Sequence, residues 1–293
     1  MKIVMPKAEI LPRMSPLKKI ELCARVAYKS ENKITEDSAE RFCRKLLELG
    51  HTSVLEHARV EVPWTRAAML LKAVHARSSN EQPYGWTSRR GWVLDTPQGE
   101  EIRLTANGRD LIDYMQCPLE DFDSLEEADD YMSVRFTCDR AIANELVRHR
   151  QMSFTQESSR YVNYKEGVEF ILPVPFDWAD LSGDPHEIPD AFADPRYQAW
   201  YFVCERAEGA YCDLIAEGCT PQEARDVLPL STKTELIMTG MYTQWEDVFK
   251  LRLDKAAHPQ MRHLMNLLVN LPEFPKDKIH LEGKIEEAET KRR

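Results

Sequence analysis

The sequence has no apolar run approaching the roughly 18 residues that a membrane-spanning helix needs. Its first residues, MKIVMPKAEILPRM, carry proline and charge where a secretory signal peptide has an apolar stretch. Both absences favour a cytoplasmic protein that does not enter a membrane. The chain of 293 residues, 43% of them hydrophobic, is long enough to bury one large core.

Cysteine pairs of the C-x-x-C type are also missing. The seven cysteines are an odd number, scattered between Cys23 and Cys219, in a chain too long to depend on disulfides. We expect them to be reduced and to pack in the core. We expect no zinc site and no other metal site.

Positive charge is in deficit. The sequence has 39 lysines and arginines against 49 acidic residues, which gives a net charge of −10 and a pI of about 5.4. A surface of this charge repels nucleic acid and anionic membranes. The deficit counts against a nucleic-acid partner, and any basic functional site must be local.

The regular alternation of strands and helices that builds a doubly wound sheet is absent. The hydrophobic periodicity instead predicts an α+β fold, with a mixed sheet and flanking helices. Strands are predicted at 58–62, 102–106, 132–139, 168–173 and 232–240. Helices are predicted at 15–30, 35–49, 66–77, 139–150, 196–217, 241–254 and 258–271.

Several residues predict where helices begin and end. Ser15, Asp139 and His258 are expected N-caps, Gly50 is an expected stop, and the stretch 220–223 reads as a capping box. Alternating residues in 132–139 predict a half-buried strand. One stripe of the helix 196–217 is predicted to be core: Trp200, Val203, Cys204, Ala207, Tyr211 and Leu214.

We expect a single domain over residues 1–293, with two additions. The stretch from about 78 to 130 changes in character and predicts an inserted excursion. Its Trp86 and Trp92, beside two arginines, fit a small loop core better than a surface for stacking bases. The tail from about residue 272 is charged, which predicts a frayed end.

The densest polar stretch of the sequence runs from Glu145 to Tyr164. Arginine forks and hydroxyl donors are the groups that bind a phosphate or diphosphate, because each phosphate oxygen accepts several charge-assisted hydrogen bonds. A solvated basic turn at the end of a helix is the alternative interpretation. The groups in question are Arg148, His149, Arg150 and Arg160, with Ser153, Thr155, Ser158 and Ser159.

The same stretch resembles a known family. Arg148-His149-Arg150, seven residues and then Ser158 match the RHR-x7-S signature of the flavin-dependent thymidylate synthases. Further segments match in the same order: GHTSVLEH (50–57), EARDVLP (223–229), and TELIMTG followed by FKLRLDKAAHPQMR (234–262). Ordered matches of this kind are hard to attribute to chance.

The resemblance implies a thymidylate synthase-complementing (ThyX-like) α+β fold in a homotetramer, with sites built from several subunits. It also implies FAD as cofactor and the conversion of dUMP to dTMP, with methylenetetrahydrofolate and NADPH as co-substrates. In this reaction Arg252 would sit at the uracil ring as the catalytic residue, since a guanidinium stabilises negative charge that develops on the base.

The resemblance also implies two sets of binding residues. The nucleotide would be held by Glu145, Arg148, Gln156, Glu157, Ser158, Ser159, Arg160, Arg225 and Arg252, with Arg160 and Arg225 nearest its phosphate. The flavin side would include His51, Ser53, Arg148, His149, Arg150, Gln156 and Asp247.

Three positions depart from the family pattern. Met241, Thr243 and Asp247 stand where the family shows Asn, Arg and His or Asn. A lost charged hydrogen bond costs roughly 1–3 kcal/mol, so we expect flavin to bind more weakly than in a typical member. The departures leave open an enzyme that modifies C5 of another pyrimidine nucleotide. A non-catalytic protein that binds nucleotides or nucleic acid is the alternative from another class.

Overall fold

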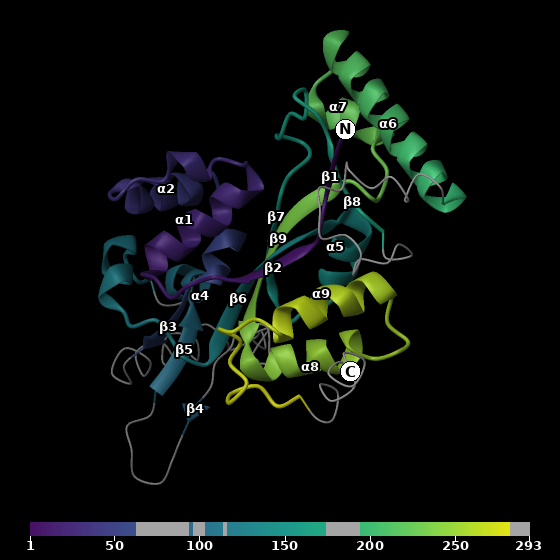
Figure 1. Ribbon diagram of the computed structural model, residues 1–293. Helices are drawn as coiled ribbons and strands as arrows, with labels where there is room; N and C mark the ends of the chain where they lie inside the picture. Colours follow the sequence, from purple (N-terminus) through teal and green to yellow (C-terminus); the bar gives the residue numbers. More distant parts are fainter. Residues whose placement is uncertain (63–93, 96–102, 114–115, 174–193, 282–293) are drawn as a thin grey trace, which may run out of the picture.

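A computed structural model describes residues 1–62, 94–95, 103–113, 116–173 and 194–281. Its centre is a four-stranded antiparallel sheet in the order β2-β6-β9-β7 (Figure 1). The two long strands pair along their whole length, from Tyr131 opposite Met241 to Asp139 opposite Lys233. The strands are β2 (Lys7–Ile10), β6 (Tyr131–Asp139), β7 (Ser153–Gln156) and β9 (Lys233–Met241).

Two smaller sheets accompany the central one. A three-stranded antiparallel sheet has the order β3-β5-β4, and a parallel pair joins β1 to β8. Helices packed on these sheets confirm the predicted α+β class, and parallel and antiparallel strand pairs both occur, in separate sheets. The strands are β1 (Lys2–Val4), β3 (Arg59–Val62), β4 (Leu94–Asp95), β5 (Arg103–Asn107) and β8 (Glu169–Ile171).

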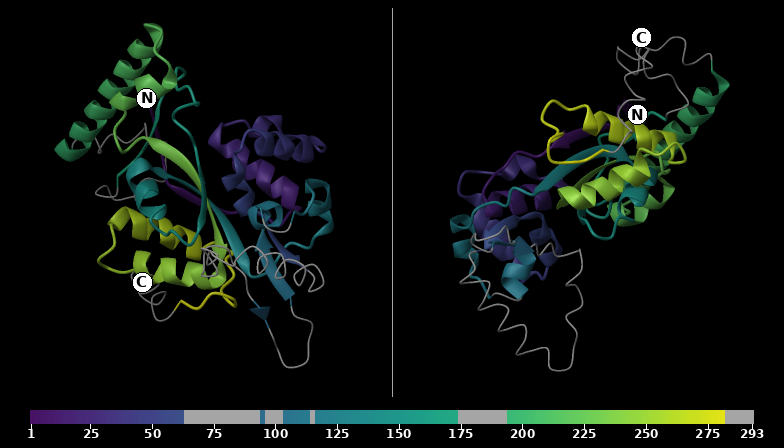
Figure 2. Two further views of the ribbon diagram at one scale, coloured as in Figure 1. Left: turned by 180° about the vertical axis from the view of Figure 1, so that it is seen from behind. Right: turned by 90° about the horizontal axis from the view of Figure 1, so that it is seen from below.

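Helices cover both faces of the central sheet. Figures 1 and 2 show α1 (Pro16–Ala27) and α2 (Ser38–Glu48) on one side, with α8 (Tyr242–Arg252) and α9 (Pro259–Val269) on the other. The shorter or outlying helices are α4 (Gly108–Asp113), α5 (Arg140–Leu146), α6 (Pro195–Ala216), α7 (Pro221–Ala224), η1 (Glu31–Lys33), η2 (Thr52–His57), η3 (Leu119–Ser124) and η6 (Arg225–Val227).

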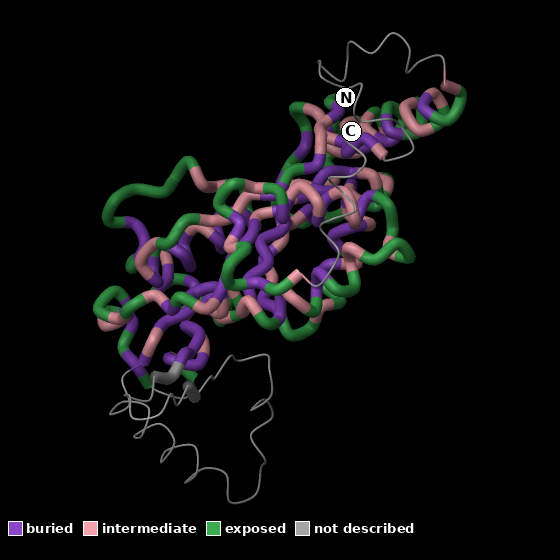
Figure 3. The backbone as a smooth tube through the Cα atoms, turned by 60° about the horizontal axis from the view of Figure 1, so that its bottom comes forward, coloured by how far each residue is buried: buried purple, intermediate pink, exposed green. Residues whose placement is uncertain are grey.

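Both faces of the central strands are covered by helices. The sequence predicted that only one face of the strand at 132–139 is buried. Leu236 and Met238 belong to the main core with residues of α8 and α9. Ile237, on the opposite face of β9, packs against Cys23 and Val26 of α1. Among the polar residues of the alternating pattern, Ser133 and Thr239 are buried, while Arg135 and Thr137 stay partly exposed. Figure 3 shows the buried segments gathered along the middle of the molecule.

Most predicted helix ends are confirmed. The Asp139 carboxylate accepts the Ile142 N–H at 2.7 Å, and Gly50 has a φ of 72° that suits glycine. The capping box at Thr220 and Glu223 is present. His258 accepts the Gln260 N–H at 3.2 Å as a cap. Ser15 is wrong as a side-chain cap, because its hydroxyl is buried without a hydrogen-bond partner.

Two expectations about burial need correction. Val203 was predicted to be core, yet it is 59% exposed, because α6 projects from the body and only one of its sides is covered (Figure 1). The tail was predicted to fray from about 272, yet Phe274 and Ile279 are buried in the main core. Within the predicted excursion, Ala106, Leu111 and Phe122 are buried against residues of α1 and α2.

Some of the remaining expectations concern residues that the structure describes, and others concern residues outside the described ranges. None of the seven cysteines, all of which lie in the described ranges, forms a disulfide, and Cys23, Cys43, Cys117, Cys138 and Cys204 are buried, as expected. In the described ranges no His, Cys, Asp and Glu group could hold a metal ion, and no helix could span a membrane. The predicted helix at 66–77 and the Trp86 to Trp92 segment lie outside the described residues. The single-domain organisation stays a prediction.

Candidate active site

Arg252 is held in place at the C-terminal end of α8. Its Nε donates to Nε2 of His149 at 2.8 Å, and one terminal nitrogen donates to a Glu145 carboxylate oxygen at 2.8 Å. The other terminal nitrogen donates to the Glu145 carbonyl oxygen at 3.0 Å. These bonds fix the plane of the guanidinium, while 19% of the side chain stays exposed. Arg252 can therefore present a fixed cation to a ligand.

His149 is neutral in this arrangement. Burial and the neighbouring Arg252 charge lower its pKa to about 4, although the Asp247 carboxylate acts in the opposite direction. Because Nε2 accepts a hydrogen bond from Arg252, the ring hydrogen must be on Nδ1. His149 therefore offers one N–H donor away from Arg252.

The other two residues of the RHR turn are exposed. In the part of the chain that the structure describes, no carboxylate pairs with Arg148 or Arg150. Asp247 is also exposed and acts electrostatically on His149. The turn thus has two exposed cations without a carboxylate partner among the described residues, and the Asp247 carboxylate lies nearby.

The loop that contains Ser158, Ser159 and Arg160 lies next to the end of α1. The Ser158 N–H donates to the carbonyl oxygen of Ala27 at 2.9 Å. The Arg160 guanidinium is exposed and lies 5.3 Å from the centre of the Tyr161 ring. Its cation is therefore available to a ligand at the surface.

Arg225 lies in the same part of the molecule as this loop. It begins η6 directly after Ala224, which is buried in one small core with Val162 and Tyr164. Its closest carboxylate contact, to Asp226, is 4.0 Å long, and its side chain is 40% exposed. Such a contact leaves the guanidinium free for a phosphate.

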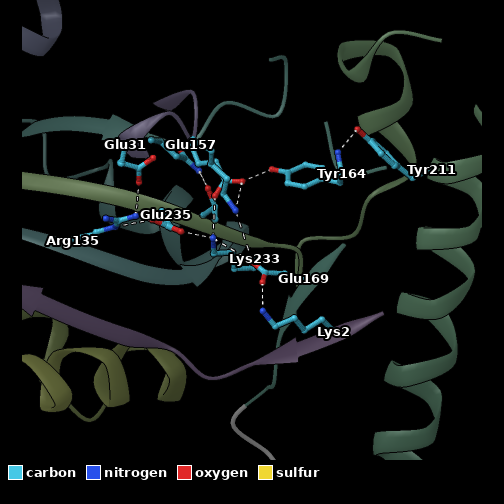
Figure 4. Close-up of polar contacts among 12 residues, drawn as sticks. Lys2, Glu31, Arg135, Glu157, Tyr164, Glu169, Tyr211, Lys233 and Glu235 are labelled. Carbon is cyan, nitrogen blue, oxygen red and sulfur yellow. Dashed lines mark hydrogen bonds and ion pairs between the residues drawn. The ribbon is translucent and has the colours of Figure 1, made fainter. Parts of the chain in front are cut away.

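Glu157 lies inside the protein, not at the surface where a nucleotide would meet it. Its side chain accepts a hydrogen bond from the Tyr164 hydroxyl at 2.6 Å and pairs with the Lys233 ammonium at 3.3 Å (Figure 4). Its neighbour Gln156 is half-buried and donates to the Thr234 hydroxyl at 3.2 Å. Nothing in the sequence pattern indicated Lys233 as a partner of Glu157.

The GHTSVLEH segment is joined to the RHR-x7-S segment through side chains. The two ring nitrogens of His57 contact the hydroxyls of Thr239 and Thr155, at 2.7 and 2.8 Å. Ser153 donates to Glu56 at 3.2 Å. The sequence match alone did not single out His57 or Glu56 as the residues that make this connection.

His57 is fully buried, which lowers its pKa to about 3, with the Lys19 and Arg59 charges acting in the same direction. Its two contacts attach η2 to β7 and β9. His51 and Ser53, at the start of the same segment, are exposed and accessible to a ligand.

The predicted site residues form two groups, which lie beside helices on opposite faces of the central sheet. Glu145, His149 and Arg252 gather beside α8, which covers one face of the central sheet. The Ser158–Arg160 loop is bonded to the end of α1, which covers the other face.

Comparison with known proteins gives the family. A family described as thymidylate synthase complementing protein matches residues 9–81 and 100–274. The chain belongs to the thymidylate synthase complementing protein family. The resemblance based on the RHR-x7-S signature is thereby confirmed, and the family match passes over residues 82–99, within the predicted excursion.

Individual relatives match a smaller part of the chain than the family does. A flavin-dependent thymidylate synthase of Mycobacterium bovis is 31% identical over 129 residues, which is 43% of this chain and 50% of that protein. One of Synechocystis sp. is 30% identical over 133 residues, 45% of this chain and 61% of that protein. The match thus spans about half the length of these curated relatives.

A solved structure, a UMP/dUMP methylase PolB from Streptomyces cacaoi bound with 5-Br dUMP, is also similar. It is 19% identical, covers 91% of this chain and 89% of its own, and has a TM-score of 0.42.

Proposed function

We propose that this chain is a flavin-dependent thymidylate synthase that converts dUMP to dTMP, with methylenetetrahydrofolate as carbon donor and NADPH as reductant. The observation that carries the proposal is the fixed Arg252 guanidinium, held by Glu145 and His149 beside the free cations of the RHR turn. Membership of the family and the names of its curated relatives support it.

Arg252 suits the electronic demand of the reaction. Methylation at C5 of uracil requires negative charge to develop on the ring, and a fixed guanidinium beside N3 and O2 stabilises that charge without reorganising. Glu145 and His149 supply the rigidity, because they fix both ends of the fork.

The residues present fit FAD, with one opposing charge. Arg148 and Arg150 offer free guanidinium groups for the diphosphate, the His149 Nδ1–H is a further donor, and His51 and Ser53 are exposed. When bound, the flavin supplies the hydride for the reduction. Asp247 places a carboxylate near this turn, so we propose weaker binding than in a typical member.

The phosphate of the nucleotide would be held by Ser158, Ser159, Arg160 and Arg225. Arg160 and Arg225 lack a close carboxylate partner among the described residues. Because this group and the Arg252 group lie on opposite faces of the sheet, a complete site would combine two chains. We therefore propose a homotetramer with shared sites, and the exposed Phe202 and Val203 of α6 suit an interface.

The test is an assay of dTMP formation by purified protein, with FAD, dUMP, methylenetetrahydrofolate and NADPH supplied. The proposal predicts dTMP and a yellow protein that releases flavin on denaturation. Bound flavin without dTMP, but with a C5-modified product from UMP or dCMP, would favour the other pyrimidine nucleotide, which the Asp247 departure leaves open. The absence of both bound flavin and any modified nucleotide would contradict the enzyme proposal.

A further inference from the structure

We propose that Lys233, Glu157 and Tyr164 form a positioning device for the nucleotide loop, fixing Ser158, Ser159 and Arg160 in the geometry that binds a phosphate. The inference rests on the proposed function, because the ligand is the phosphate of the same nucleotide. Here Glu157 and Lys233 are positioning residues and do not touch the ligand themselves.

The central contact is an ion pair withdrawn from solvent. Glu157 is 1% exposed and Lys233 is 5% exposed, so neither charge can be solvated by bulk water. The Lys233 ammonium contacts Glu157 at 3.3 Å, Glu169 at 3.5 Å and Glu235 at 2.5 Å. Removing one member of such a group leaves a buried charge without its partner, which is costly.

The surrounding charges are balanced. The carboxylates of Glu31, Glu157, Glu169 and Glu235 alternate with the cations of Lys2, Arg135 and Lys233 (Figure 4). Lys29 is the fourth cation and pairs with Glu157 and Glu169. Burial alone would lower the pKa of Lys233, but the Glu157 charge and the Glu235 hydrogen bond raise it above its usual value. The lysine therefore stays charged at neutral pH.

Glu157 is also held by groups that reach two other elements. The Tyr164 hydroxyl donates to it at 2.6 Å, and the Tyr164 N–H donates to the Tyr211 hydroxyl of α6 at 3.2 Å. The Glu157 N–H donates to the Glu235 carbonyl oxygen of β9 at 2.8 Å. Both the backbone and the side chain of Glu157 are thus fixed.

Because Glu157 directly precedes the phosphate-binding loop, its fixed position also fixes the start of that loop. It immediately precedes Ser158, whose N–H is bonded to the end of α1, and Tyr161 and Val162 both donate to the Ser158 carbonyl oxygen. The loop is therefore fixed at its start by one anchor, the buried Glu157, and its backbone turns back on itself within a few residues. A phosphate-binding group loses affinity when its donors must be ordered on binding, so the anchor preserves affinity by ordering them in advance.

The experiment compares Glu157→Gln with Glu31→Gln, which removes a carboxylate from the far end of the same network. Affinities for dUMP and for deoxyuridine, which has no phosphate, are measured on the full chain. Hydrogen exchange of residues 158–162 is followed in parallel. Lys233→Arg keeps the cation and serves as the conservative variant.

We expect Glu157→Gln to weaken dUMP binding about tenfold or more, with little change for deoxyuridine, and to speed exchange in 158–162. Glu31→Gln and Lys233→Arg should retain dUMP affinity. If Glu157→Gln does not fold, Glu157→Asp, which keeps the charge but shortens its reach, must show the same selective loss.

Unchanged dUMP affinity, or an equal loss for dUMP and deoxyuridine, overturns the positioning role. If the unmodified protein binds no dUMP, the proposed function fails. In that case faster exchange confined to 158–162 still supports the anchor, and unchanged exchange there overturns it.

Discussion

The Arg252 guanidinium donates to Nε2 of His149, so the cation of one residue fixes the tautomer and neutrality of the other. The low pKa of His149, about 4, follows from burial and from this neighbour. One residue comes from the RHR turn and the other from α8, more than a hundred positions apart. The contact therefore joins two segments that carry the family resemblance into one charged surface, from which the catalytic predictions follow.

Arg252→Lys should lower turnover much more than it weakens dUMP binding. Lysine keeps the charge but cannot reproduce the planar fork that contacts His149 and Glu145 together, and loss of a preorganised donor typically costs about 10²–10³-fold in kcat. Steady-state kinetics would separate kcat from KM. Arg44→Lys, on the exposed face of α2, is the matched control and should leave both unchanged.

Arg160→Ala should weaken dUMP binding by roughly 1.5–3 kcal/mol, which corresponds to about ten- to a hundredfold in Kd. The guanidinium is exposed and lies 5.3 Å from the centre of the Tyr161 ring, so its removal should leave folding intact. Calorimetric titration with dUMP measures the effect. Equal affinities of the variant and the unmodified protein would remove Arg160 from the phosphate site.

His57 should make the protein sensitive to mild acid. Burial lowers its folded-state pKa to about 3, below the ordinary value of 6.5, so between these values the unfolded chain binds a proton that the native protein does not. The stabilisation is complete above pH 6.5 and is lost as the pH falls towards 3. From pH 7 to pH 5 the loss from this group should be about 2 kcal/mol.

The measurement is urea unfolding of the unmodified protein and of His57→Gln at both pH values. Glutamine can still bond to the Thr155 or Thr239 hydroxyl but cannot take up a proton. The variant should therefore lose less stability between pH 7 and pH 5. The same pH slope in both proteins would show that His57 does not titrate as described.

Asp247→His should tighten FAD binding, because it removes a carboxylate that opposes the diphosphate and adds a possible donor beside the RHR turn. Fluorescence titration with FAD compares the two proteins. Glu246→Gln removes the adjacent negative charge and should have little effect. If the unmodified protein retains stoichiometric flavin through dialysis and Asp247→His loosens it, Asp247 belongs to a rearranged flavin site.

Local signals in the sequence predicted many of the helices and strands. Hydrophobic spacing located the long strands and helices, and Asp139, Gly50 and Thr220 ended elements as expected because caps act within a few residues. Burial was less predictable. Phe274 packs against Phe249, with ring centres 5.6 Å apart, although it lies in a charged tail, because distant packing decides which residues of such a tail are covered.

The candidate site shows the same limit. The RHR-x7-S spacing and Arg252 could be found from motifs, but the spacing cannot reveal which side chains meet. Glu157 carries the same charge as exposed acidic residues, and only the fold brings Lys233 and Tyr164 to it. Likewise, the sequence could not show that Arg252 and Ser158 lie beside helices on opposite faces of one sheet.

That separation makes the shared site the central claim, and mixing two inactive variants tests it most directly. Arg252→Ala and Arg225→Ala are purified separately, then unfolded and refolded together at equal concentrations. If each site takes one arginine from each of two chains, random mixing leaves about a quarter of sites intact, and dTMP formation should recover to about that fraction. Mixed assemblies with no more activity than either variant alone would contradict the account.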